Sequence, residues 1–194
     1  MKIMNKCADL LRKNKDDIAT IMAMEQGKPI DQAKGEIDGS ADFIEWYAAD
    51  AMRIQGETVM QTKNGRRETV WKEPVGVCAA ITPWNFPASM IARKVAPGIA
   101  AGCPVVLKPA ELTPFTAFAF AKCAEEAGIP AGILNVLTGK ASEIGRAMTE
   151  SKTVRKLSFT GSTGVGKLLY QQCASNIKKM SLELGGNAPF IVFD

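Results

Sequence analysis

The rhythm of hydrophobic and polar positions changes along this chain. From residue 74 onward, short runs rich in Val, Ile and Leu alternate with longer stretches of helical periodicity. Strands are predicted at 75–81, 104–108, 133–137 and 154–159, and again near 180–184 and 189–193. Helices are predicted between them at about 87–101, 113–127, 141–150 and 162–175. Short apolar strands separated by helices are typical of a parallel sheet covered on both faces, so we expect an α/β, Rossmann-like open parallel sheet.

The residues before this region have a different texture. Residues 2–26 resemble two short amphipathic helices, broken around Asn14 and ended by Gly27-Lys28-Pro29, and a longer helix is predicted from Asp31 to Ile54. Strand-like runs flank Asn64-Gly65, and Asn-Gly is the strongest local signal of a β-hairpin. The expected division is a helical N-terminal part (1–56), a protruding hairpin (57–73) and the Rossmann-like domain (74–194).

Composition and charge narrow the classes of function. A net charge of +4 is too small to indicate nucleic-acid binding, and no apolar run approaches the roughly 20 residues of a membrane-spanning helix. Residues 1–24 carry interspersed charges rather than the apolar core of a signal peptide. The 5 cysteines are scattered and form no C-x-x-C pair, which favours a reducing, cytoplasmic compartment and argues against zinc. Because the sequence has no histidine, we expect no histidine-ligated metal, and acid–base work must fall to carboxylates or lysines.

A glycine-rich turn within residues 157–167 predicts a phosphate site. A strand-like run leads into Gly161 and a helix-like stretch follows, which directs backbone N–H groups and a helix dipole at an anion. The spacing Gly161-x4-Gly166-Lys167 fits the first positions of a P-loop, but Leu168 stands where Ser or Thr would bind magnesium. The dinucleotide fingerprint G-x-G-x-x-G is not matched either. A P-loop nucleotide hydrolase and a non-catalytic nucleotide-binding or oligomer-forming module stay open as alternatives.

Four motifs in a fixed order carry a family resemblance. They are Thr82-Pro-Trp-Asn-Phe-Pro87, Leu107-Lys-Pro-Ala-Glu-Leu-Thr-Pro114, Phe159-Thr-Gly-Ser162 and Leu182-Glu-Leu-Gly-Gly-Asn-Ala-Pro189. In this order the chain resembles the NAD(P)-dependent aldehyde dehydrogenases over essentially its whole length. Three further segments look most like the succinate-semialdehyde dehydrogenase branch: Glu45-Trp-Tyr-Ala48, Arg53-Ile-x-Gly-Glu57 and Met90-Ile-Ala-Arg-Lys94.

The resemblance implies two catalytic residues, Asn85 and Glu183. Asn85 lies between two prolines on a loop that leaves a strand, and a rigid loop presenting a carboxamide suits an oxyanion donor. Glu183 lies between two leucines, where we expect a desolvated carboxylate that acts as a general base. In the resembled family this glutamate activates the water that hydrolyses the acyl-enzyme.

The resemblance also implies a dinucleotide site. Lys108 and Glu111 are expected to bind the adenosine ribose, and because Glu111 would repel a 2′-phosphate, NAD is favoured while NADP stays open. Gly161 and Ser162 begin the helix that is expected to meet the pyrophosphate, with Ser162 as its N-cap. We expect Asn85, Lys108 and Ser162 to face one crevice at the carboxyl ends of the strands. The remaining cofactor residues implied by the family pattern are Ile81, Thr82, Pro83, Trp84, Gly166 and Leu184.

Arg93 is the substrate residue that the resemblance implies. It matches a position that helps to hold the distal carboxylate of the substrate in the succinate-semialdehyde branch, and a planar guanidinium suits that contact. The implied substrate is succinate semialdehyde, with a general aliphatic aldehyde dehydrogenase as the alternative.

The resemblance finally implies a larger protein. The family's nucleophilic cysteine lies downstream of the Glu-Leu-Gly-Gly motif, and Cys78 and Cys173 look like small core residues. We interpret the chain as the cofactor-binding part of an enzyme and expect residues 1–194 alone to be inactive. The family implies a homodimer or homotetramer assembled partly through the hairpin. Because the chain starts late relative to the family, a mitochondrial location stays open beside the cytoplasm.

Overall fold

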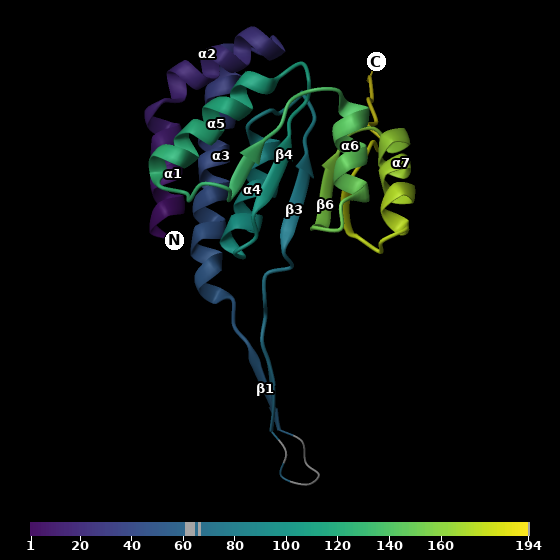
Figure 1. Ribbon diagram of the computed structural model, residues 1–194. Coiled ribbons are helices and arrows are strands. Elements are labelled where there is room, and N and C mark those ends of the chain that lie inside the picture. The colour runs from purple at the N-terminus through teal and green to yellow at the C-terminus, as the bar shows by residue number, and fades with distance from the viewer. Residues whose placement is uncertain (61–64, 66, 194) are drawn as a thin grey trace.

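A five-stranded parallel sheet forms the centre of the protein (Figure 1). The structure is a computed structural model, and it describes residues 1–60, 65 and 67–193. Three helices precede the sheet: α1 (Lys2–Lys13), α2 (Lys15–Gln26) and α3 (Ile30–Asp50), the last followed by the 3-10 turn η1 (Ala51–Arg53). The hairpin strands are β1 (Glu57–Met60) and β2 (Arg67–Val70). The sheet domain then runs β3 (Val77–Ile81), α4 (Ser89–Ala100), β4 (Val105–Lys108), α5 (Pro114–Ala127), β5 (Leu134–Val136), α6 (Ala141–Glu150), β6 (Val154–Thr160), α7 (Thr163–Ala174) and β7 (Lys179–Glu183).

The strand order determines where a ligand can bind. The order is β5-β4-β3-β6-β7, with every neighbouring pair parallel. From β3 the chain moves outward through β4 to β5, then returns to the other side of β3 and moves outward again through β6 to β7. In open α/β sheets, ligands bind outside the carboxyl ends of the strands at such a reversal. The crevice is therefore expected between the loops that follow β3 and β6.

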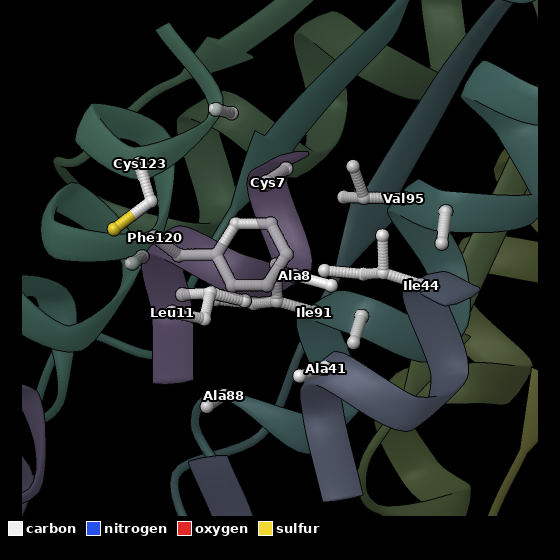
Figure 2. Close-up of a cluster of buried hydrophobic side chains, with 14 of the residues drawn as sticks. Cys7, Ala8, Leu11, Ala41, Ile44, Ala88, Ile91, Val95, Phe120 and Cys123 are labelled. Atoms are coloured by element: carbon white, nitrogen blue, oxygen red, sulfur yellow. The ribbon is translucent and has the colours of Figure 1, made fainter. Parts of the chain in front are cut away.

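The two faces of the sheet bury separate apolar cores. Alternate residues of a strand point to opposite faces, so Ala80 and Leu107 pack with α1 to α5, whereas Ala79 packs with Leu157 and Phe159 under α6 and α7. Figure 2 shows the larger core, in which the Phe120 ring of α5 lies among side chains of α1, α3 and α4. The predicted sheet with helices on both faces is confirmed.

A register shift in β6 leaves one polar face beside α4. Val77 of β3 pairs with Val154, but the next residue, Cys78, pairs with Lys156, so Arg155 is an extra residue in the ladder. Val154 and Leu157 consequently both belong to the core under α6 and α7. The opposite face of β6 carries polar side chains, and α4 and α5 cover the sheet mainly over β3, β4 and β5.

The hairpin projects far from the sheet domain (Figure 1). Strands β1 and β2 pair antiparallel from Glu57 opposite Val70 to Met60 opposite Arg67, and all their residues are exposed. The predicted hairpin is confirmed as a strand pair. Gly65 has a φ of +63°, while Asn64 of the predicted Asn-Gly turn lies outside the described residues.

The predicted strand at 189–193 is wrong. These residues follow β7 without pairing, and their apolar side chains, such as Phe190 and Phe193, are exposed. A strand requires a partner for its backbone groups, and nothing in the described part of the chain lies beside this segment to supply one. Among the described residues, no helix is both long and apolar enough to span a bilayer.

Candidate active site

A groove of about 1120 Å³ runs between α4 and the polar face of β6 and β7. Its floor carries Lys156, Ser158 and Ser181, because the register shift in β6 directs these side chains away from the apolar core. Asn85 and Glu183 both line this groove. The two residues expected to do chemistry are therefore on the same side of the sheet.

Asn85 lies on the loop between β3 and α4. The loop begins at Thr82, which is buried and donates its N–H to the Lys108 carbonyl over 3.2 Å, and Pro87 near its end is fully buried. Asn85 itself is exposed, and no other described residue hydrogen-bonds to its carboxamide. The carboxamide is thus available to a ligand in the groove. Of the other predicted cofactor residues here, Ile81 ends β3, and Pro83 and Trp84 line the groove.

Glu183 is the last residue of β7, and its surroundings differ from the expectation. Its side chain is exposed in the groove rather than enclosed by the flanking leucines. Successive strand residues point to opposite faces, so Leu182 packs on the core under α6 and α7, and Leu184, just past the strand, packs against α7 at Gly166. The Glu183 carbonyl accepts the Gly161 N–H over 3.1 Å, which joins the end of β7 to the turn after β6.

Lys94 is a groove residue that the sequence reasoning did not single out. Its ammonium donates to the Ser158 hydroxyl over 3.0 Å. Burial lowers the pKa of Lys94 to about 8, and the neighbouring Arg93 and Lys156 add to this, while the Glu183 carboxylate opposes it. A lysine that titrates near neutrality beside a carboxylate is a typical feature of functional sites. In the sequence Lys94 follows another basic residue, Arg93, which is exposed, and this pair does not indicate that the Lys94 ammonium is partly buried.

Arg93 lines the same groove and has no carboxylate partner among the described residues. Its guanidinium lies over the Phe43 ring, 4.8 Å from the ring centroid, and its side chain is otherwise open to the groove. A cation–π contact orients the guanidinium without neutralising its charge. Arg93 can therefore accept an anionic group.

Lys108 and Glu111 lie at the same edge of the sheet but not in the groove. Lys108 ends β4 and is buried, with its ammonium 3.8 Å from Glu111 Oε1. Glu111 lines a second cavity of about 450 Å³, together with Pro109 and Lys140. Asn85 and Ser162 line the same groove, whereas Lys108 does not line it, so a crevice shared by all three stays a prediction. Strand β4, which ends at Lys108, lies on the opposite side of β3 from β6, which leads to Ser162.

The helices that follow the sheet strands differ at their N-termini. A carboxylate from elsewhere accepts backbone N–H groups at three of them. Glu36 accepts at α4, Glu25 at α5 over 2.8 and 2.9 Å, and Glu111 at α6 over 2.8 Å. At α7 there is no such carboxylate among the described residues, and the Ser162 hydroxyl accepts the Val165 N–H over 3.4 Å. The first N–H groups of α7 are therefore open to an anion.

Two glycines of this turn, Gly161 and Gly166, serve close packing. A Cβ at position 161 would lie 2.5 Å from Phe159 Cζ, and one at position 166 would lie 2.4 Å from Leu184 Cδ2. The Gly166 N–H already donates to the Ser162 carbonyl over 3.0 Å, inside a helix that begins at Thr163. The residues of the P-loop spacing are thus mostly helical and do not enclose a phosphate, which counts against the P-loop alternative.

The cysteines are buried and free. Burial raises the pKa of the Cys78 thiol to about 11 and that of Cys7 to about 12, and it also raises the pKa of Cys123 and Cys173. The thiolate is the nucleophilic form, so these thiols are unreactive at neutral pH. The interpretation of Cys78 and Cys173 as core residues agrees with this burial.

Comparison with known proteins gives one consistent family. The family model described as "Aldehyde dehydrogenase family" matches residues 1–194. A succinate-semialdehyde dehydrogenase of Escherichia coli strain K12, whose name specifies NADP(+), is 56% identical over 192 residues, which are 99% of this chain and 40% of that protein. A glutarate-semialdehyde dehydrogenase of Pseudomonas putida strain KT2440 is 58% identical over 186 residues, 96% of this chain and 39% of that protein.

Solved structures agree with this result. The crystal structure of an aldehyde dehydrogenase from Brucella melitensis biovar abortus 2308 superposes with a TM-score of 0.96 at 61% sequence identity. The match covers 100% of this chain and 40% of that one. The chain thus spans about 40% of the length of the relatives it matches.

Proposed function

Because this chain belongs to the aldehyde dehydrogenase family, we propose that it is the cofactor-binding part of an enzyme that oxidises an aldehyde to an acid with NAD(P). One observation carries the proposal. Asn85, Ser162 and Glu183 line a single groove at the point where the strand order reverses. An oxyanion donor, an open helix N-terminus and a carboxylate base are the groups this chemistry requires.

In this proposal Asn85 stabilises the carbonyl oxygen of the substrate and Glu183 activates a water. The Asn85 carboxamide donates to the carbonyl oxygen as negative charge develops on it. Glu183 takes a proton from the water that releases the acid, and its exposure in the groove leaves it accessible to that water. The Glu183 carboxylate raises the pKa of the Lys94 ammonium and so opposes the larger effect of burial on that lysine. The buried cysteines of this chain do not suit the nucleophile, so the proposal takes the thiolate from outside residues 1–194.

The residues at the sheet edge fit a dinucleotide. The open N–H groups at the start of α7 and the Ser162 hydroxyl suit a pyrophosphate. Lys108 and Glu111 would hold the adenosine ribose: Glu111 Oε1 accepts the Ala141 N–H, and Oε2 has no partner among the described residues. Gly166 would act indirectly, by letting Leu184 pack against α7. When bound, the nicotinamide supplies the hydride acceptor, and the carboxylate of Glu111 favours NAD over NADP.

The proposed substrate is a semialdehyde with a distal carboxylate, and succinate semialdehyde is the first candidate. Arg93 supports this choice because its charge faces the groove without a carboxylate partner in the described chain. The names of the relatives include both succinate and glutarate semialdehydes, so the length between aldehyde and carboxylate is the property left to test.

The exposed hairpin supports a proposal about assembly, and the free cysteines support one about the compartment. The hairpin exposes apolar residues, among them Val59, Met60 and Trp71, and an isolated two-stranded ribbon needs a partner surface. A homodimer or homotetramer joined through the hairpin would supply it. The free cysteines fit a reducing compartment such as the cytoplasm.

The experiment is steady-state NADH formation by an enzyme of family length that contains residues 1–194. Succinate semialdehyde, glutarate semialdehyde and the uncharged aldehyde butanal are compared in wild type and in Arg93→Ala. We expect Arg93→Ala to lower kcat/KM for the charged substrates by about 10–100-fold, the loss of one charge-assisted contact, and to affect butanal little. Equal losses on all three would favour the general aliphatic alternative. The absence of aldehyde-dependent NADH from the wild type would overturn the proposal.

A further inference from the structure

A buried ion pair lies beneath the loop that carries Asn85. It joins Lys28, in the turn between α2 and α3, to Glu36 in the middle of α3, with side-chain exposures of 8% and 3%. Glu36 stands on the apolar stripe of α3, next to the buried residues Ala33 and Ile37. A charged residue on such a stripe is the sequence signal that could have identified it.

Both members of the pair bind the loop directly. Glu36 Oε1 accepts the N–H groups of Ala88 and Ser89 over 2.9 and 3.0 Å, while Glu36 Oε2 accepts from Lys28. Lys28 Nζ also donates to the backbone carbonyl of Asn85 over 3.0 Å. The same ammonium lies 4.4 Å from the centroid of the Phe86 ring.

These contacts fix the loop on both sides of Pro87. The Asn85 carbonyl is held before the proline, and the first two amides of α4 are held after it. The Asn85 carboxamide has no partner of its own among the described residues, so its direction depends on these backbone contacts. Removing two charges from water is costly, and the hydrogen bonds that Lys28 and Glu36 make to each other and to the loop offset that cost.

We propose that Lys28 and Glu36 are positioning residues that hold Asn85 in the geometry of an oxyanion donor. The inference rests on the proposed function, since it takes the Asn85 carboxamide as the group that binds the carbonyl oxygen. Neither Lys28 nor Glu36 is among the residues that line the groove. They act through the loop backbone, in which a shift of about 1 Å at the donor can cost about 100-fold in rate.

A second ion pair on α3 provides a matched control. Lys15 Nζ contacts Asp38 Oδ2 over 2.9 Å, two positions from Glu36, and joins α2 to α3 without touching the loop. Lys15→Met therefore removes a cross-helix ion pair of the same helix and leaves the Asn85 contacts intact.

The test uses the family-length enzyme with three changes: Lys28→Met, the double variant Lys28→Met/Glu36→Gln, and Lys15→Met. The double variant keeps an amide oxygen for the two α4 N–H groups and leaves no buried charge unpaired, so it guards against loss of folding. We expect both Lys28 variants to lower kcat by about 10–100-fold with KM changed less than about 3-fold, because the donor is displaced only in its transition-state contact. Lys15→Met is expected to leave kcat unchanged.

A cycle with Asn85→Ala separates positioning from general destabilisation. If Lys28 acts through Asn85, Lys28→Met lowers kcat far less once Asn85 is already Ala. An undiminished loss in that background, or wild-type kcat in the folded double variant, would overturn the proposal.

Hydrogen exchange tests whether Lys28 positions the loop even if Asn85 is not the oxyanion donor. If Asn85→Ala leaves kcat unchanged, the oxyanion role of Asn85 falls. Faster exchange of the amides of residues 84–86, 88 and 89 in Lys28→Met than in Lys15→Met would still support the positioning of the loop. Equal exchange in the two variants would overturn it.

Discussion

Two helices begin beside the point where the strand order reverses, and their N-termini are in opposite states. At α4 the Glu36 carboxylate accepts two backbone N–H groups, so the positive end of the helix is already occupied by an anion of the protein. At α7 the Ser162 hydroxyl accepts one N–H over 3.4 Å, and the N–H groups of Thr163 and Gly164 have no partner in the described chain. From this comparison we propose a division of roles, in which the loop before α4 is a fixed platform and the start of α7 is a receptor for an anion.

The largest expected effect is on the platform. In a family-length enzyme, Asn85→Ala should lower kcat by about 100–1000-fold, the usual effect of removing one oxyanion donor, and leave the Kd for NAD unchanged. Stopped-flow and equilibrium binding measure the two quantities separately. Asn135→Ala, which removes an exposed asparagine of β5 bonded to the Gly132 carbonyl, is the control. A Kd that rises with a constant kcat would place Asn85 on the cofactor side and remove the division.

The next effect is on the receptor. Thr163→Glu adds to α7 the kind of carboxylate that α4, α5 and α6 already have. The change should stabilise the fold by about 0.3–1 kcal/mol through the helix dipole, while it weakens NAD binding about 10–100-fold by repelling the pyrophosphate. Chemical denaturation measures the change in stability, and calorimetric titration measures the change in NAD affinity. Thr163→Gln has nearly the same size without the charge and should leave the affinity close to wild type; an equal loss there would indicate sterics rather than charge.

The α6 N-terminus combines the two states, because Glu111 both accepts the Ala141 N–H and is proposed to bind the ribose. Glu111→Gln keeps an oxygen for that N–H and removes only the charge. We expect the ratio of NADP to NAD use to rise by about 10-fold, one like-charge contact of about 1.4 kcal/mol, without a loss of stability. Competition of the two cofactors in one assay measures the ratio. An unchanged ratio would show that Glu111 acts solely as a cap.

The sequence predicted the order of strands and helices of the sheet domain because apolar periodicity and turn residues are local. It did not predict the contacts that join distant segments. Glu36 and Ser89 are 53 positions apart in the sequence, so nothing local in the sequence indicates their hydrogen bond. Glu183 was expected to be desolvated by its leucine neighbours, but strand alternation turns Leu182 to the other face and leaves the Glu183 side chain exposed. The strand expected at 189–193 had the right composition and lacked a partner, which composition does not reveal.

The smallest effect concerns Lys94, which lies in the groove between the platform and the receptor. Its pKa is about 8 in the folded chain and 10.5 when unperturbed, so between these values the unfolded chain holds a proton that the folded chain has released. Stability therefore gains from this group as pH rises through that range. Lys94→Met should be more stable than wild type by about 1 kcal/mol below pH 8, allowing for partial exposure, with the difference shrinking toward pH 10.5.

Denaturant unfolding at several pH values measures this difference. Lys122→Met, at an exposed lysine that contacts Glu125 on α5, is the control for loss of a charge and should show no gain in stability at neutral pH. A Lys94→Met difference that stays constant from pH 7 to pH 11 would show that the Lys94 ammonium is well solvated.

The division between platform and receptor is tested most directly by backbone amide shifts during a titration with NAD. The N–H signals of Thr163 and Gly164 should move saturably with NAD, because these groups are open at the start of α7. The signals of Ala88 and Ser89 should stay in place, because Glu36 already accepts their hydrogens. Saturable shifts of Ala88 and Ser89 with none at Thr163 and Gly164 would contradict the account.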